Sequence, residues 1–438
     1  MNQSMEASAH DQRRPAMRSR PARGQPRAEE VLREPMFARF WTASTVSSVG
    51  TAATSIALPV LVVRYLGASN FEVGLVNAAQ LLPYLVLGLL AGVFIDRWRR
   101  RPMLIRTSIG RAVLLASVPA FWAVGWLSLP LLIVILVGFG ALNVFAIAGA
   151  QSFLPAVVSR PQLFRANARI DQSDAVAQTL GPAAGGALVA ALGAPLILLI
   201  DAVSYVVNAV LIGRIKVLEP TPEPVDRRSG IGAAIKDGVR WIYRHPTLGP
   251  MTVSSHVWFI GNNAMLTVLA PFALRDLDLS SLTFGLLFAL LGVATLAGAL
   301  LSPRIGDLLG VGRTVVTCRA GYPVALVLLG VIAGHGVSRT AAVVVVFGAL
   351  GLWGLISGVE NPVEMGYRQT ITPPNFLGRV NSTARSANRT CAVLGALAGG
   401  AVSGAFGYRT AFLLGAAALI APFVIAVVTP LRSARIET

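Results

Sequence analysis

The sequence predicts an all-α polytopic membrane protein with 12 transmembrane helices arranged as two parallel six-helix bundles. The hydropathy of the chain, the placement of its basic residues and an internal repeat predict this fold class. Of the 438 residues, 54% are hydrophobic and only 13% are charged, whereas about a quarter of a soluble domain is charged. Apolar runs of about 20 residues, long enough to cross a bilayer, recur from residue 37 onward.

Changes in polarity, together with Gly and Pro, delimit twelve predicted spans. They are 38–66, 71–95, 102–126, 131–157, 164–192, 195–217, 248–274, 281–306, 313–334, 340–370, 378–406 and 409–431. The predicted organisation is a disordered basic cytoplasmic tail (1–36), an N-terminal six-helix bundle (37–218), a cytoplasmic linker (219–247), a C-terminal six-helix bundle (248–431) and a cytoplasmic tail (432–438).

The linker contains apolar residues at helical spacing: Ile231, Ile235, Val239 and Ile242. This pattern is typical of an amphipathic helix lying in the membrane interface. A plain soluble linker helix is the alternative.

The basic residues are distributed unevenly across the predicted membrane. The net charge is +17, which in a soluble protein would suggest nucleic acid. Here all Lys and Arg fall on one side, or in that half of a span, except Arg64, Arg275, Arg339 and Arg409. The positive-inside rule makes the basic side, with both termini, cytoplasmic. We therefore expect a protein of the plasma (inner) membrane that faces anionic lipid headgroups and binds no nucleic acid.

The chain also repeats itself. The segment NARIDQSDAVAQTLGPAAGGALVAALG from Asn167 matches NSTARSANRTCAVLGALAGGAVSGAFG from Asn381 without gaps, at an offset of 214 residues. SNFEVGL from Ser69 matches SSLTFGL from Ser280 at an offset of 211. Similar offsets predict two halves of the same orientation, with a substrate path at their interface near the midplane.

Two motifs stand out within the first half. After the second span, the chain reads GVFIDRWRRRP and fits the pattern G-x-x-x-D-R-x-x-R-R with Gly92, Asp96, Arg97, Arg100 and Arg101. The matching turn of the second half, RIGDLLGVGR, keeps Gly306, Asp307 and Arg313.

The second motif is GPAAGG in span five. The motif ends at Gly186, and within it Gly181 and Gly185 share a helix face, so that another helix can approach closely. Pro182 lacks a backbone donor and permits a bend.

These features, over about 37–431, resemble the major facilitator superfamily. The first motif matches the signature of that family between spans two and three. GPAAGG matches the core of its exporter signature, although Ala168 and Ala177 stand where further glycines are usual. Segments such as FWTASTVSSVGTAATSIALPVLV and NFLGRVNS resemble a drug efflux branch that includes macrolide and tetracycline pumps and a catecholate siderophore exporter.

The resemblance implies export of amphiphilic small molecules by alternating access, in exchange for protons. It also implies a conformational gate in which Asp96 faces the positive N-terminal end of span eleven near 376–378. The alternative is that Asp96 only balances Arg97.

No feature of the sequence predicts an enzyme. It has no phosphate-binding loop, no metal-ligand spacing among its two cysteines and four histidines, and no catalytic constellation. We therefore expect no cofactor and no metal, and an ion gradient must supply the energy for active transport.

Proton coupling needs an ionisable group that can be buried in its neutral form. The embedded candidates are Asp171, Asp174, Asp201, Glu360, Glu364, Arg111 and Arg385. The repeat places Asp171 opposite Arg385, so this pair could form in one state and separate in the other. Alternatively, Asp171 and Asp174 only balance Arg165 and Arg169. We expect Arg111 to pair with Asp201, Asp174 or a carbonyl group.

Sparse polar and aromatic residues on cavity-lining spans are the candidate substrate contacts: Asn77, Gln80, Tyr84, Asn143, Trp258, Asn262 and Asn263. A mostly apolar cavity with a few amides suits a large amphiphile, although each residue could instead be a helix–helix contact. Alternative functions are dedicated export of one metabolite, such as a siderophore or a self-made antibiotic, and a non-transporting receptor or scramblase. We expect a monomer.

Overall fold

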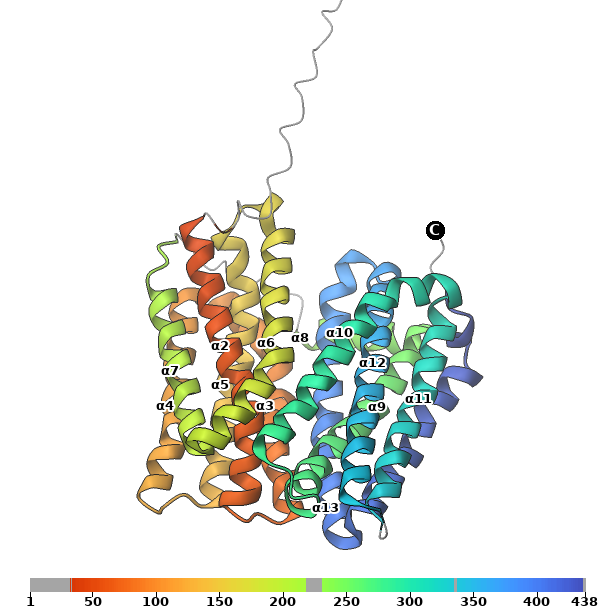
Figure 1. The fold of residues 1–438 in the computed structure, drawn as a ribbon. Helices are drawn as coiled ribbons and strands as arrows, with labels where there is room; N and C mark the ends of the chain where they lie inside the picture. Colours follow the sequence, from red (N-terminus) through yellow and green to blue (C-terminus); the bar gives the residue numbers. More distant parts are fainter. Residues whose placement is uncertain (1–31, 33, 218–230, 335–336, 436–438) are drawn as a thin grey trace, which may run out of the picture.

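The computed structural model describes residues 32, 34–217, 231–334 and 337–435, with the side chains of 89–97, 231–235 and 374–375 excepted. Every regular element in these ranges is helical (Figure 1). The first half contains α2 (Pro35–Val60) with the π-helical turn η1 (Leu61–Tyr65), α3 (Asn70–Arg97), α4 (Arg100–Ala123), α5 (Leu129–Val157), η2 (Arg160–Gln162), α6 (Leu163–Leu192) and α7 (Ala194–Gly213).

The second half follows the linker. It contains α8 (Ile231–Arg244), α9 (Leu248–Pro271) with the π-helical turn η3 (Phe272–Asp276), α10 (Ser281–Leu309), α11 (Val311–Ile332), α12 (Arg339–Ile371), α13 (Pro374–Val428) and η4 (Pro430–Ser433). The predicted boundaries of the first ten spans agree with these helices within a few residues.

Eleven helices of the described residues are long and apolar enough to cross a membrane. The last of them, Phe376–Val428 within α13, has 53 residues and would extend about 80 Å if it were straight. The hydrocarbon core of a bilayer is only about 30 Å thick. At Gly407 the backbone leaves the helical region, with φ 80° and ψ 171°, at the turn that the sequence predicts between spans eleven and twelve.

The helices form two groups that stand side by side (Figure 1). Helices α2 to α7 pack on one another, as do α9 to α13, and the groups meet mainly where α3 contacts α13 and α6 contacts α10. The repeat relates α3 to α10 and α6 to α13, so these two contacts are equivalent. The start of α2 and the end of the described chain lie at one end of the molecule; we call the opposite end the far end.

Glycines bring the two groups close together. A Cβ atom on Gly186 of α6 would lie 3.1 Å from the Cα of Gly285 on α10, and one on Gly400 of α13 would lie 3.0 Å from the Cα of Gly74 on α3. The offsets of the repeat relate one pair to the other. Neither interface has room for a side chain.

The other glycines of GPAAGG face a helix within the first group. Gly181 packs on Ala52 of α2, and a Cβ atom on Gly185 would lie 2.7 Å from the Cα of Ala53. Pro182 is buried, and its carbonyl group faces Gly285. The motif therefore serves two interfaces, one within a group and one between groups.

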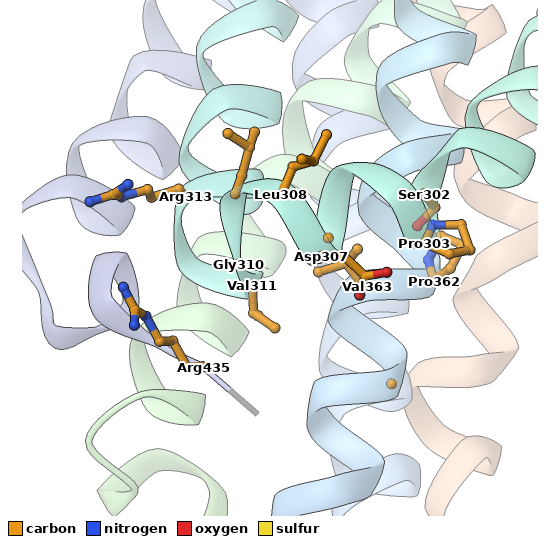
Figure 2. A pocket seen from close by; sticks show the side chains of 13 residues that line it. Ser302, Pro303, Asp307, Leu308, Gly310, Val311, Arg313, Pro362, Val363 and Arg435 are labelled. Carbon is orange, nitrogen blue, oxygen red and sulfur yellow. The ribbon is translucent and has the colours of Figure 1, made fainter. Parts of the chain in front are cut away.

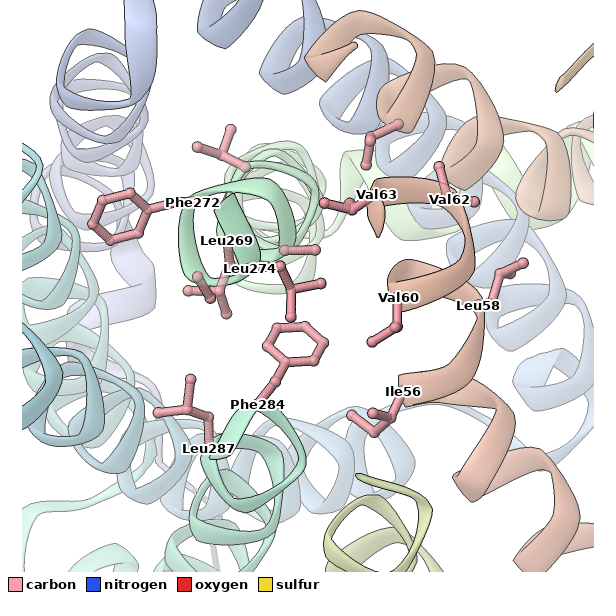
Figure 3. Close-up of a cluster of buried hydrophobic side chains, with 14 of the residues drawn as sticks. Ile56, Leu58, Val60, Val62, Val63, Leu269, Phe272, Leu274, Phe284 and Leu287 are labelled. Carbon is pink, nitrogen blue, oxygen red and sulfur yellow. The ribbon is translucent and has the colours of Figure 1, made fainter. Parts of the chain in front are cut away.

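Apolar side chains close the far end. Those of α2 and η1 meet those of α9, η3 and α10 in one cluster that includes Ile56, Val60, Leu274 and Phe284 (Figure 3). Because lipid tails are as apolar as these side chains, close packing rather than removal from lipid stabilises such contacts inside a membrane.

Two arginines reinforce this closure. Arg64 at the end of η1 donates to the carbonyl oxygens of Leu279 (2.7 Å) and Leu274 (3.4 Å), and it lies 3.3 Å from the Asp278 carboxylate. Carbonyl groups in the last turn of a helix lack intrahelical partners, and a guanidinium group satisfies several at once.

The second arginine makes the equivalent contacts from the second half to the first. Arg275 at the end of η3 donates to the carbonyl oxygens of Val63 (3.2 Å) and Ala68. Arg64 and Arg275, with their carbonyl acceptors, are related by the offset of 211 residues. We call this reciprocal pair the arginine clasp.

Candidate functional site

A buried ion-pair network lies inside the second half. Arg319 of α11 is 2% exposed. Its Nε donates to a carboxylate oxygen of Glu360, and its Nη2 lies 3.3 Å from Oε2 of Glu364 and 3.1 Å from the Ser255 hydroxyl. Glu360 and Glu364 are one turn apart on α12 and therefore face the same way.

Other groups complete the coordination of the two carboxylates. The Tyr322 hydroxyl donates to Glu360 at 2.7 Å, while Arg368 Nη2 and the Ser255 hydroxyl donate to Oε1 of Glu364 at 2.7 and 2.8 Å. We call these three residues, together with Arg319, Glu360 and Glu364, the Arg319 network. With two guanidinium groups and two carboxylates, it is neutral when every group is ionised.

A cavity of about 270 Å³ opens onto the Arg319 network. Its lining includes Arg319, Glu360, Glu364, Asn388 and the predicted cavity residue Trp258. A cavity of this size holds several waters, because one water occupies about 30 Å³ of liquid. The cavity is therefore large enough for water to reach the carboxylates that line it.

Glu360 and Glu364 are among the embedded candidates that the sequence predicts, whereas Arg319 is not. Arg319 lies in the middle of an apolar helix, where a cation needs a partner. This position within an apolar helix is the sequence feature that could have predicted a buried ion pair.

The first half buries Arg111 of α4 in a different way. Its Nη1 donates to Asn143 Oδ1 at 3.2 Å and its Nη2 to the Ser108 hydroxyl at 3.3 Å. The guanidinium carbon lies 4.3 Å from the centre of the Tyr205 ring, which is a cation–π contact. Asn143 in turn donates to the hydroxyl of Tyr84 at 3.4 Å. We call these five residues the Arg111 cluster.

The expected ion pair of Arg111 with Asp201 or Asp174 is wrong. Among the described residues, no carboxylate lies within ion-pair distance of Arg111. Asp201 is buried but accepts from the hydroxyls of Thr54 (2.7 Å) and Ser204 (3.0 Å). Tyr205, one helical turn from Asp201, presents its ring to the guanidinium instead.

The acids of α6 lie at the edge of the packed core. Asp174 is half-buried and accepts from the Ser48 hydroxyl at 2.5 Å, while Asp171 is exposed. In the described part of the chain, neither forms an ion pair with Arg165, Arg169 or Arg385. Instead, Arg169 lies over the ring of Trp41, 5.7 Å from its centre.

Three predicted cavity residues line a pocket between the two groups. This pocket of about 230 Å³ contains Asn77 and Gln80 of α3 and Asn263 of α9, among apolar side chains such as Phe284 and Phe288 of α10.

Two side-chain contacts cross between the groups, the first of them within the lining of this pocket. Asn77 Nδ2 donates to the Thr267 hydroxyl at 3.1 Å. Arg389 of α13 lies over the ring of Tyr84, 5.4 Å from its centre. Asn262 lies outside the lining of this pocket and of the cavity at the Arg319 network.

The signature after α3 is described only in part. The side chains of Gly92, Asp96 and Arg97 lie outside the described residues, so the predicted gate contact of Asp96 stays a prediction. Arg100 begins α4. Arg101 donates to the carbonyl oxygens of Ile212 (3.3 Å) and Gly213, where it complements the negative end of α7.

Comparison with known proteins places the chain among membrane transporters. Residues 29–437 match the family model described as transmembrane secretion effector. The MFS-type transporter y4rN of Sinorhizobium fredii is 30% identical over 336 residues, which cover 75% of this chain and 79% of the relative. The multidrug efflux pump Tap of Mycolicibacterium fortuitum is 25% identical over 410 residues, 89% of this chain and 94% of Tap.

Solved structures share the fold at low sequence identity. A bacterial homologue of the iron transporter ferroportin in an inward-facing state matches with a TM-score of 0.69 and 18% identity, over 90% of this chain and 98% of that one. The nucleoside transporter NupG matches with a TM-score of 0.68 and 12% identity, over 90% and 98% of the two chains.

Proposed function

The chain belongs to the transmembrane secretion effector family of major facilitator transporters, and on that premise we propose that it exports amphiphilic small molecules in exchange for protons. The Arg319 network is the observation that carries this proposal. It places two carboxylates inside a membrane helix bundle, next to a cavity that can hold water. A transporter that uses a proton gradient needs such a group, buried and able to change its charge.

We propose that the chain crosses the plasma (inner) membrane twelve times, with α13 crossing twice around Gly407. The two six-helix bundles would span 37–218 and 248–431, with both termini in the cytoplasm. Support comes from the positive-inside distribution of Lys and Arg. The far end then faces outward, so the arginine clasp and the glycine contacts hold this conformation closed to the outside.

Proton exchange would proceed through Glu364 and Glu360. A proton that binds to Glu364 would remove the negative charge that holds Arg368 and the Nη2 atom of Arg319. Glu360 would keep its contacts with Arg319 Nε and with Tyr322. The network would then carry a net charge of +1, which is costly inside a membrane. Rearrangement of α11 against α12 toward a wetter environment would lower that cost and couple protonation to the conformational change.

Export, rather than uptake, is supported by the relationship to Tap and by the GPAAGG motif. The pocket between the groups supports an amphiphilic substrate, because its apolar walls carry only three amide side chains, Asn77, Gln80 and Asn263. Polar groups of this kind orient a ligand by hydrogen bonds, while the apolar walls accept the rest.

Everted membrane vesicles with an imposed proton gradient test this function. Macrolides, tetracyclines, dyes and siderophores would be added in turn while the gradient is followed. Dissipation by several compounds, and none in vesicles without the protein, is the expected result. Dissipation by a single compound would indicate a dedicated exporter, and transport that leaves the gradient unchanged would contradict proton exchange.

A further inference from the structure

The C-terminal segment folds back onto the turn between α10 and α11. Leu431 and Ala434 are buried there, and the Gly312 N–H donates to the Ala434 carbonyl oxygen at 3.0 Å. A Cβ atom on Gly312 would collide with the backbone of 431–432. The turn and the segment therefore form one fixed surface at the end of the molecule opposite the far end.

Two adjoining cavities lie on this surface. Their volumes are about 660 and 720 Å³, and both are lined by Leu309, Arg313 and Arg435. Figure 2 shows Arg313 of α11 and Arg435 of the C-terminal segment on the same side of the first cavity, with Asp307 toward the other. Two distant parts of the sequence thus supply a pair of guanidinium groups to one site.

The described lining of the site carries a net positive charge. Arg313 and Arg432 line the second cavity together with Arg435, while Asp307 is the one acid in the lining of either cavity. Within the described ranges, none of these three arginines forms an ion pair or a side-chain hydrogen bond. Guanidinium groups bind phosphate oxygens in a bidentate manner.

Apolar side chains continue from the arginines along the helices. Leu308 is 83% exposed, Leu309 is 41% exposed, and Val428 at the end of α13 is 72% exposed. Such leucines beside arginines at the end of a membrane helix suit a ligand with an anionic head and apolar chains. A small water-soluble anion would leave them uncovered.

The equivalent turn of the first half is arranged differently. There Arg101 contacts the carbonyl oxygens at the end of α7. In the second half the corresponding turn leaves Arg313 facing the cavities, and the C-terminal segment adds two more arginines.

We propose that these cavities form a binding site for one anionic phospholipid. Arg313 and Arg435 hold its phosphate, Arg432 contributes to the positive field, and its acyl chains follow Leu308 and Leu309. The lipid would join the α10–α11 turn to the C-terminal segment. This site is separate from the proposed transport path and does not depend on the transported substrate.

Lipid binding to the purified full-length protein in detergent tests the site. Phosphatidylglycerol and phosphatidylcholine would be titrated and the bound lipid counted by native mass spectrometry. We expect one phosphatidylglycerol to bind about tenfold more tightly than phosphatidylcholine, because both lipids carry a phosphate but the arginines repel the choline cation of phosphatidylcholine. The double variant Arg313→Gln/Arg435→Gln should lose this preference.

A matched control separates a specific site from general attraction between charges. The double variant Arg244→Gln/Arg304→Gln removes the same charge from exposed positions at the same end, and it should keep the preference. Loss of the preference in both double variants, or in neither, would overturn the proposal. Competition by inorganic phosphate at the same concentration as the lipid would also overturn it, because the site would then bind a soluble anion.

Discussion

Arg111 in the first half and Arg319 in the second occupy equivalent places, 208 residues apart, yet their surroundings differ. Both lie in the third helix of their half. The next helices match at the same offset, VGFGAL at 137–142 and VVFGAL at 345–350. Arg111 is held by neutral groups, Asn143, Ser108 and the ring of Tyr205, whereas Arg319 is held by two carboxylates.

The difference arises from two positions on the fourth helix of each half. At the offset of 208, Glu360 corresponds to Ser152 and Glu364 to Ala156, neither of which can carry a negative charge. The first half therefore holds a buried arginine whose hydrogen-bond partners are neutral, while the buried Asp201 is bonded to hydroxyl groups instead. The second half places two carboxylates beside the equivalent arginine, which is why the proposed proton coupling is assigned to it.

Replacing each buried arginine in turn should give the largest difference in stability between the two halves. Arg319→Gln leaves two buried carboxylates without their shared cation and should destabilise the fold by about 3–5 kcal/mol. Arg111→Gln leaves neutral partners that can bond to the new amide, and should cost about 1–2 kcal/mol. Thermal unfolding in detergent would show the larger loss for Arg319→Gln; equal losses would remove the distinction between the two sites.

The arginine clasp should behave symmetrically, in contrast to the two buried arginines. Arg64→Gln and Arg275→Gln each remove charge-assisted hydrogen bonds of about 1.5–3 kcal/mol that hold the far end closed. Labelling of a Gln80→Cys reporter, in a Cys318→Ser/Cys391→Ser background, should become faster from outside in both variants. An effect in one variant alone would contradict the equivalence of the two contacts.

The equivalent glycines should show a similar symmetry with a smaller effect. Gly186→Ala and Gly400→Ala each force two helices apart and should cost about 1–3 kcal/mol of overpacking. Gly366→Ala is the control, because a Cβ atom there meets no atom within 4 Å. We expect slower transport in Gly186→Ala and Gly400→Ala and unchanged transport in the control. An equal effect in all three variants would instead indicate that the loss of helix flexibility is the cause.

The pocket between the groups should give the smallest effect. Asn77→Ala removes one hydrogen bond to Thr267 and one amide from the lining, worth about 1 kcal/mol. We expect a KM change of several-fold that differs among substrates, with little change in the amount of folded protein. The same change for every substrate would indicate a helix contact rather than a substrate contact.

Much of this fold follows from the sequence, because a membrane restricts the possible structures. Apolar runs must be helices there, since backbone groups have no other partners in lipid, and charge changes mark where helices end. Offsets of 211 and 214 indicated the equivalence of the halves, which the Gly186–Gly285 and Gly400–Gly74 contacts then show in space.

The site was less accessible to prediction, because pairing between helices depends on their rotation. Glu360 and Glu364 were identifiable from their spacing, but their partner Arg319 is 41 residues away on another helix. For Arg111, nothing in the sequence indicates that the ring of Tyr205 takes the place expected for the carboxylate of Asp201. Residue types mark an embedded charge, whereas only the packed structure identifies what neutralises it.

Proton-driven accumulation of a fluorescent amphiphile in everted vesicles tests proton coupling through the Arg319 network. Glu364→Gln, which mimics the protonated network and leaves Glu360 paired with Arg319, would be compared with Asp171→Asn/Asp174→Asn, and gradient-independent substrate exchange would be measured in the same vesicles. We expect the glutamate variant to keep substrate exchange but to lose proton-driven accumulation. The aspartate variant should keep substrate exchange and proton-driven accumulation. Full proton-driven accumulation in the glutamate variant, or its loss only in the aspartate variant, would contradict coupling through the Arg319 network.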